Sequence, residues 1–222
     1  MSAAGEHATG AAMARRPIPS RSRGWARQLM RWLDGRGVTP NQVSAAGLGF
    51  GALAGVALWL APGLTGVEAA ALLITAATCI GWRLLANMAD GMLAVEAGRA
   101  TPDGPLWNEL PDRLADTAVL AGLGAGIGEP VLGLLAALTA LFGAQVRTLG
   151  EALGHPGDFG GPLAKPQRMG LVAAGALAAV ALGAVWPLEA TLWLVLTGTA
   201  LTVCLRLARL QRRCLGAASD AR

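Results

Sequence analysis

The chain has 222 residues, of which 54% are hydrophobic and only 14% charged, with a net charge of +4 and a mean hydropathy of +0.49. A soluble domain of this length would carry roughly 25% charged residues. The composition therefore excludes an ordinary soluble protein and predicts a polytopic membrane protein, for which no nucleic-acid partner is expected.

The N-terminal region is polar and basic. Residues 1–24 are rich in Ala, Gly, Ser and Arg, and we expect a disordered basic tail. Over residues 25–36, the apolar side chains Trp25, Leu29 and Trp32 recur on one face of a predicted helix, with arginines on other faces. This pattern is typical of an amphipathic helix in the membrane interface. The alternative is a short helix packed on the protein.

Six apolar segments follow, each near the ~20 residues that cross a bilayer. We expect them at residues 43–62, 69–94, 108–127, 131–149, 169–186 and 190–208. The first is preceded by Thr39-Pro40-Asn41-Gln42, a helix-start pattern with Thr as N-cap and Pro at the first position. The predicted fold is all-α and integral to the membrane, with a membrane domain over residues 25–210 and a tail over 211–222.

Charge predicts the orientation of these segments. The short connectors Ala61–Glu68, Gly128–Pro130 and Trp186–Glu189 contain no Lys or Arg, whereas the opposite ends of the segments are basic. By the positive-inside rule, both termini face the cytoplasm and the protein lies in the cell (inner) membrane. Repeated glycines in the first and third segments would let helices approach closely, within one chain or across a dimer interface.

Polar side chains gather where segments two and three are joined. Asn87 and Asp90 fall at i and i+3 on segment two, and Asn108, Asp112 and Asp116 at i, i+4 and i+8 on segment three. Each set therefore lies on one helix face. Carboxylates in apolar surroundings are costly unless paired or bound to a cation, so they mark a candidate site. Oxygen ligands without nearby His or Cys favour Mg²⁺ or Mn²⁺.

These residues resemble the motif of the CDP-alcohol phosphatidyltransferase family, Asp-x2-Asp-Gly-x2-Ala-Arg-x8-Gly-x3-Asp-x3-Asp. Aligned without gaps, its positions are occupied by Asn87, Asp90, Gly91, Ala94, Val95, Gly104, Asn108 and Asp112. Asn thus replaces the first and third Asp, and Val95 replaces the Arg. A second register makes Asp112 and Asp116 the closing pair, with Asn108 in place of Gly. The ungapped register is preferred, and both keep Asp112 in the site.

The resemblance implies a six-helix transferase of phospholipid biosynthesis. It would move a phosphatidyl group from CDP-diacylglycerol to an alcohol acceptor and release CMP, as a homodimer with Mg²⁺ or Mn²⁺. The implied metal ligands are Asn87, Asp90, Asn108, Asp112 and Asp116. Asp112 or Asp116 would be the catalytic base. The implied CDP-binding residues are Gly91, Ala94 and Gly104.

Basic residues near the end of segment four and before segment five are candidates for acceptor binding. Arg147, Lys165 and Arg168 could bind an acceptor phosphate, as the corresponding loop does in relatives that use inositol phosphate or glycerol phosphate. The positive-inside rule explains the same charges. Arg83 shares a helix face with Asn87, and an ion pair with an intramembrane carboxylate is favoured for it over substrate contact.

Two other classes of protein remain as alternatives. A cation transporter could line an ion path with facing carboxylates, but the polar residues gather at one membrane end. A non-catalytic binding protein on the same fold is consistent with Val95 and the two Asn.

Overall fold

The computed structural model describes residues 24–99 and 101–220, and it is all-helical within these ranges. The elements are α1 (Gly24–Gly35), α2 (Pro40–Leu60), the 3-10 turn η2 (Ala61–Gly63), α3 (Gly66–Val95), α4 (Gly104–Gly126), α5 (Pro130–Ala152), α6 (Lys165–Leu182) and α7 (Trp186–Asp220). The tail expected over residues 1–24 lies outside the described residues, apart from Gly24.

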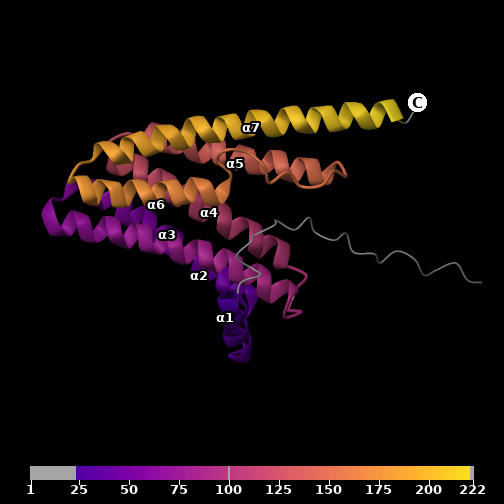
Figure 1. Cartoon of the computed structure of the whole chain (residues 1–222), viewed down its shortest axis with the longest axis horizontal. Helices are drawn as coiled ribbons and strands as arrows, with labels where there is room; N and C mark the ends of the chain where they lie inside the picture. Colours follow the sequence, from indigo (N-terminus) through magenta and orange to yellow (C-terminus); the bar gives the residue numbers. More distant parts are fainter. Residues whose placement is uncertain (1–23, 100, 221–222) are drawn as a thin grey trace, which may run out of the picture.

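Helices α2 to α7 run alternately in opposite directions along a common axis, and α1 lies across them (Figure 1). The short connectors 61–65, 127–129 and 183–185 lie at one end of this bundle. The longer loops, described over 96–99 and 101–103 between α3 and α4 and over 153–164 between α5 and α6, lie toward the other end. The loop 96–103 joins the two polar stripes, so the candidate site belongs to the end with the long loops.

Helix α2 begins where the sequence predicts. The Thr39 hydroxyl accepts the Gln42 N–H at 3.3 Å, the Gln42 side chain accepts the Thr39 N–H at 3.0 Å, and Pro40 occupies the first turn. This reciprocal pair satisfies two donors that a helix N-terminus otherwise leaves without partners. Ser44, one turn further along α2, is thereby held in register with the site described below.

Helix α2 packs on both α3 and α4, and its contact with α4 is made through glycines. A Cβ atom added at Gly55 would lie 2.4 Å from the carbonyl oxygen of Ala118, and one added at Gly122 would lie 2.1 Å from the carbonyl oxygen of Gly55. Backbones this close leave no room for a side chain. Of the two uses that the sequence allows, these glycines serve packing within one chain.

Four helical stretches of the described residues are long and apolar enough to cross a membrane: Pro40–Gly63, Gly66–Val95, Pro130–Ala152 and Trp186–Gly216. Helices α4 and α6 fall short because polar side chains occupy the first half of α4 and the first turn of α6. Along α5, Leu134, Leu138 and Phe142 follow one another a turn apart, and each is more than half exposed. A surface this apolar suits lipid rather than water. The chain is a helical membrane protein.

A helix, α1, is present where the sequence predicts an amphipathic one. Its Ala26 is buried against Met88 and Met92 of α3, whereas Trp25 and Trp32 are about half exposed. Helix α1 thus packs on the bundle through a small residue and leaves its indole rings at the surface, where amphipathic rings can contact a membrane interface.

The last two helices differ from their predicted boundaries. Trp186–Glu189, predicted as a connector, forms the first turn of α7, and the connector is 183–185. Gly183 ends α6 with a left-handed φ of 60°, which glycine adopts without steric cost. Helix α7 continues to Asp220, although the apolar segment ends near residue 208. Hydropathy locates apolar residues and does not show where a helix stops.

Candidate active site

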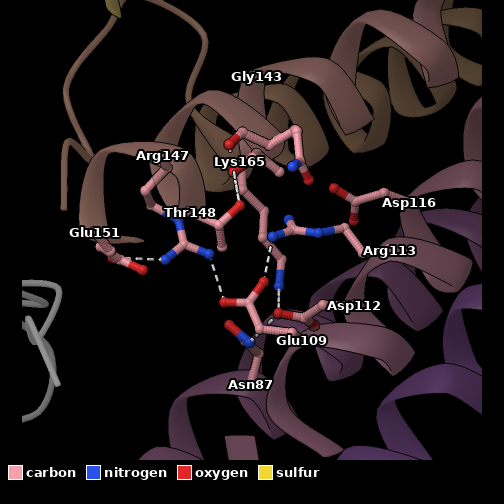
Figure 2. A network of polar contacts seen from close by, with 12 residues as sticks. Asn87, Glu109, Asp112, Arg113, Asp116, Gly143, Arg147, Thr148, Glu151 and Lys165 are labelled. Atoms are coloured by element: carbon pink, nitrogen blue, oxygen red, sulfur yellow. Dashed lines mark hydrogen bonds and ion pairs between the residues drawn. The ribbon is translucent and has the colours of Figure 1, made fainter. Parts of the chain in front are cut away.

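The polar stripes of α3 and α4 face each other, as the sequence predicts. The Asn87 amide donates a 2.8 Å hydrogen bond to Oδ2 of Asp112. One turn earlier on α3, Arg83 contacts both Asp112 and Asp116 of α4. In Figure 2, Lys165 points from α6 toward the same Asp112 carboxylate. The structure therefore brings together residues from three helices.

Asp116 is an enclosed carboxylate, with a side chain only 9% exposed. Its Oδ1 accepts a hydrogen bond from Arg83, and its Oδ2 accepts one of 2.5 Å from Arg168. A buried carboxylate between two guanidinium groups forms a compensated ion cluster. The ion pair that sequence reasoning favoured for Arg83 is present, and both oxygens of Asp116 are engaged.

Asp112 lies one turn nearer the loop and is more accessible, with a side chain 22% exposed. Its Oδ2 is contacted by the Lys165 ammonium and by the Asn87 amide, and its Oδ1 lies 3.5 Å from Arg83. The Asp112 main-chain oxygen also accepts a 3.0 Å hydrogen bond from Arg83. Asp112 is thus held in place by α3 and α6.

Asp90 lies on α3 beside this cluster and is 5% exposed. Its Oδ2 accepts a 2.8 Å hydrogen bond from the Ser44 hydroxyl, and its Oδ1 accepts one of 2.6 Å from the N–H of Gly91. Asp90 also lies within electrostatic range of Asp112 and Lys165. Sequence reasoning missed Ser44, because a single serine in an apolar helix carries no signal of its partner.

The residues expected to contact CDP lie on both sides of the loop 96–103. Gly91 and Ala94 are half-buried in the last turns of α3, and Gly104 is half-buried as the first residue of α4. A Cβ atom added at Gly104 would meet only the Thr101 hydroxyl oxygen, at 3.5 Å. The backbone of this loop end is therefore open to close approach by a ligand.

Two other positions of the motif are exposed. Asn108 points to the surface of α4, and Val95, at the position of the family arginine, is 59% exposed. The nearby Arg99 pairs with the Asp34 carboxylate at 2.6 Å and its main-chain oxygen at 3.1 Å. Asp34 belongs to α1, so Arg99 ties the end of α3 to α1 in this structure.

Arg147 of α5 lies in a separate set of ion pairs next to the cluster (Figure 2). It contacts Glu109 of α4 at 2.5 Å and Glu151 at 2.9 Å. Arg113 binds the same Glu109 carboxylate, so its guanidinium group points away from Asp112. Of the three predicted acceptor-binding residues, Lys165 and Arg168 therefore join the aspartates, and Arg147 joins the glutamates.

The loop that precedes Lys165 is held by α7, which sequence reasoning did not foresee. Arg206 donates hydrogen bonds to the main-chain oxygens of Gly160 (2.9 Å) and Gly143 (2.8 Å), and Arg209 pairs with Asp158 at 3.1 Å. The helical continuation beyond the apolar segment supplies Arg209. Helix α7 thereby fixes the loop that delivers Lys165 and Arg168 to the site.

The cluster contains positively charged nitrogen atoms that lack hydrogen-bond acceptors. Within the described part of the chain these buried atoms are Lys165 Nζ, Arg168 Nε, Arg83 Nε and Arg83 Nη1; Lys165 keeps only its ion pair with Asp112. Buried donors without acceptors call for an explanation, and an anionic ligand would supply the acceptors.

A metal ion would have few charged ligands here. Among residues 24–99 and 101–220, no group of three or more His, Cys, Asp or Glu side chains could hold one. The remaining donors are the carboxylates of Asp90 and Asp112 and the amide oxygens of Asn87 and Asn108. Oxygen donors of this kind fit a hard divalent cation, but they supply only two negative charges.

Comparison with known proteins identifies phosphatidylinositol phosphate synthases of bacteria as relatives of this chain. No family model matches the chain. It is 32% identical over 177 residues to a phosphatidylinositol phosphate synthase of Corynebacterium glutamicum, covering 77% of this chain and 76% of the relative. It is 33% identical over 128 residues to that of Mycobacteroides abscessus, covering 54% and 58%. The matches to the M. abscessus and Mycolicibacterium smegmatis proteins span about three fifths of those relatives (58% and 62%).

Solved structures agree. Phosphatidylinositol phosphate synthase of Mycobacterium tuberculosis in complex with manganese and citrate superposes with a TM-score of 0.68 at 27% identity, covering 84% of this chain and 88% of that one. The same enzyme with CDP-DAG bound gives a TM-score of 0.67 at 27% identity, covering 83% and 92%. The fold thus defines a helical membrane protein with the architecture of these synthases. The chain belongs to the CDP-alcohol phosphatidyltransferase family.

Proposed function

We propose that the chain transfers a phosphatidyl group from CDP-diacylglycerol to a phosphorylated alcohol and releases CMP. The observation that carries this proposal is the position of Asp112, the last residue of the family motif. Asp112 of α4 faces Asn87 of α3 and is also contacted by the buried Lys165 of α6. Family membership favours a transferase over the alternative cation transporter.

A phosphorylated acceptor is supported by the basic side of the cluster. Within the described residues, the buried Lys165 Nζ has no acceptor besides Asp112 and the buried Arg168 Nε has none, and phosphate oxygens would provide further acceptors. The relatives are phosphatidylinositol phosphate synthases, so inositol phosphate is the first acceptor to test and glycerol phosphate the second. Arg147 would join them only after exchanging Glu109 or Glu151 for the acceptor.

Asp112 would accept the proton of the attacking hydroxyl, which makes the acceptor oxygen a better nucleophile. Its partial exposure and its position nearer the loop suit this role better than the position of Asp116, whose oxygens are bound by two arginines. This difference supports the ungapped register of the motif. Asp116 would then position Arg83 and Arg168 rather than act as base or metal ligand.

Mg²⁺ or Mn²⁺ would be held by Asp90 and Asp112, with amide oxygens of Asn87 and Asn108. When bound, such a cation stabilises the negative charge that develops on the diphosphate and on the departing CMP. Gly91, Ala94 and Gly104 would let the nucleotide approach the backbone. With Val95 in place of the family arginine, nucleotide binding would depend more strongly on the cation and on these backbone contacts.

The membrane arrangement is part of the proposal. All of α2 to α7 would cross the membrane, with the polar first half of α4 and first turn of α6 enclosed by the other helices at the cytoplasmic end. Helix α1 would lie in the interface, with Trp25 and Trp32 in the headgroup region. Both termini would be cytoplasmic, the membrane would be the cell (inner) membrane, and two chains would form a homodimer as the family resemblance implies.

The decisive test is CMP release. Purified protein in lipid nanodiscs is given CDP-diacylglycerol, Mg²⁺ or Mn²⁺, and in turn inositol phosphate, glycerol phosphate, inositol, serine or choline. We expect CMP release with a phosphorylated acceptor and much less with the others. The Asp112→Asn variant is the matched inactive control. No release with any acceptor would overturn the transferase assignment and favour a binding protein on the same fold.

A further inference from the structure

We propose that Lys165 and the divalent cation compete for Asp112, so that binding of a phosphorylated acceptor to Lys165 tightens cation binding. This inference rests on the proposed function, because it concerns the same cation and acceptor. It adds a coupling between the two ligands that is built into the ion pair between α4 and α6.

Both oxygens of Asp112 are already engaged. Oδ2 is contacted by Lys165 and by Asn87, and Oδ1 lies 3.5 Å from Arg83. A divalent cation needs a carboxylate oxygen at direct bonding distance and is repelled by a neighbouring ammonium group. The positive charges around Asp112, and the Lys165 ammonium group in particular, therefore weaken cation binding at this carboxylate until one of them withdraws.

Lys165 is the partner that can withdraw. Arg83 is 1% exposed and also bound to Asp116 and to the Asp112 main-chain oxygen, so it is fixed. Asn87 is neutral, and rotation of its amide would offer an oxygen to the cation instead of N–H groups. Lys165 carries a full charge on a flexible four-carbon stem, and Asp112 is its one ion-pair partner among the described residues.

A phosphorylated acceptor offers the Lys165 ammonium group an anionic partner other than Asp112. Among the described residues Lys165 Nζ reaches no acceptor other than the Asp112 carboxylate, and Arg168 Nε, one turn later on α6, has none. A phosphate dianion bound by these two side chains would draw Lys165 off Asp112. The cation would then take the vacated oxygen.

The two Asn residues at motif positions increase the effect of the Lys165–Asp112 ion pair on cation affinity. Because Asn occupies positions 87 and 108, Asp90 and Asp112 are the charged donors that the ungapped motif leaves, and Lys165 neutralises one of them. Cation affinity should therefore be low while the ion pair is closed and higher once it opens. By linkage, the cation must increase phosphate affinity by the same factor, typically about 5–150-fold for coupled sites.

The test measures Mn²⁺ binding rather than catalysis. Free Mn²⁺ is followed by electron paramagnetic resonance during titration of the full-length protein in nanodiscs, with and without inositol phosphate or glycerol phosphate, after correction for Mn²⁺ bound by the phosphate ester alone. We expect either ester to tighten Mn²⁺ binding to the wild-type protein about tenfold, within the usual range of coupled sites. Unesterified inositol should have no effect.

The Lys165→Gln variant should bind Mn²⁺ about tenfold more tightly than wild type without any phosphate ester, and added ester should change its affinity no further. Lys165→Met serves if the glutamine variant is not monodisperse. The matched control is Arg113→Gln, which also removes one positive charge, at the residue next to Asp112, but whose ion-pair partner is Glu109. It should change Mn²⁺ affinity much less and retain the effect of the ester.

Each contrary result has a distinct meaning. Mn²⁺ binding that is unaffected by phosphate esters and by Lys165→Gln overturns the coupling and leaves the transferase assignment intact. Equal tightening in the Arg113→Gln variant also overturns it, because the effect would then be one of general charge. Absence of Mn²⁺ binding in all variants overturns the cation site itself. Coupling without CMP release would contradict the proposed transferase function alone.

Discussion

At the scale of single residues, two aspartates one helical turn apart have different surroundings. Asp112 has a side chain 22% exposed and is contacted by Lys165, whereas Asp116 is 9% exposed and lies between Arg83 and Arg168. The more accessible carboxylate can exchange its partner for a ligand or a proton. The enclosed one stabilises the cluster that surrounds it.

Substitution of the two aspartates should separate these roles. We expect Asp112→Asn to lose about 10²–10⁴-fold in CMP release at every Mg²⁺ concentration, as for removal of a general base, while the protein stays folded. Asp116→Asn should instead lower the melting temperature, because two buried arginines lose their counter-charge, at a cost of about 3–5 kcal/mol.

The measurements are CMP release over a range of Mg²⁺ concentrations and thermal unfolding in detergent. Glu109→Gln, which alters the neighbouring set of ion pairs, is the control for a general loss of charge on α4. If Asp116→Asn were instead inactive at every Mg²⁺ concentration while Asp112→Asn recovered with excess Mg²⁺, Asp116 would be the base, Asp112 a metal ligand, and the shifted register would be correct.

At the scale of helices, α2 and α4 are joined by backbone contact and α6 is positioned by α7. The first junction depends on residues without side chains: Gly55 and Gly122 allow the two backbones to touch. Since α4 carries Asp112, this packing determines how far the carboxylate lies from α3. The second junction depends on Arg206 and Arg209, which hold the loop before Lys165.

The added methyl group of a Gly→Ala substitution should destabilise the protein only where the glycine is in contact with another backbone. Gly122→Ala places a Cβ atom 2.1 Å from the Gly55 oxygen, whereas Gly49→Ala meets nothing within 4 Å. We expect Gly122→Ala to destabilise the protein by about 1–3 kcal/mol through overpacking. Gly49→Ala should be neutral or stabilising, because alanine is the better helix former. Equal melting temperatures for the two variants in the same detergent would contradict this account of the α2–α4 contact.

Replacement of Arg206 should weaken binding of the phosphorylated acceptor more than binding of CDP-diacylglycerol. Replacing it with Met removes the hydrogen bonds to Gly160 and Gly143 and loosens the loop that ends at Lys165. We expect the KM for the phosphorylated acceptor to rise severalfold, with a smaller change in the KM for CDP-diacylglycerol. Steady-state CMP release measured against each substrate in turn checks this, and a matching rise in both KM values would indicate general destabilisation instead.

At the scale of the whole molecule, the short connectors lie at one end of the bundle and the site at the end with the long loops (Figure 1). The surface between the two ends is covered by apolar side chains such as Leu134 and Leu138. This distribution fits a protein immersed in lipid whose polar residues collect at one membrane face.

Cysteine labelling should show which face this is. In a background without the three native cysteines, Thr65→Cys in the first short connector should react with an impermeant maleimide only from outside the cell. Gly154→Cys in the loop before α6 should react only after the membrane is made permeable. The basic residues at the site end motivate this expectation, and the reverse labelling pattern would invert the proposed orientation.

The sequence by itself determined the class of fold, the number of long helices and the residues of the motif. Apolar runs report helices buried in lipid directly, and the capping box at Thr39 marks the start of α2 without reference to any other element. The i, i+3 and i, i+4 spacings also showed that the polar residues of α3 and α4 share one face of each helix.

Only the tertiary structure decided which partner each polar residue takes. Ser44 meets Asp90 across 46 residues, Arg168 meets Asp116 across 52, and Lys165 meets Asp112. Periodicity within one helix contains no information about the rotation of another, which is set by the packing of side chains and glycines over the whole bundle. For this reason Asp112 and Asp116 look alike in the sequence, and three-dimensional packing alone pairs Asp112 with a lysine and encloses Asp116 between two buried arginines.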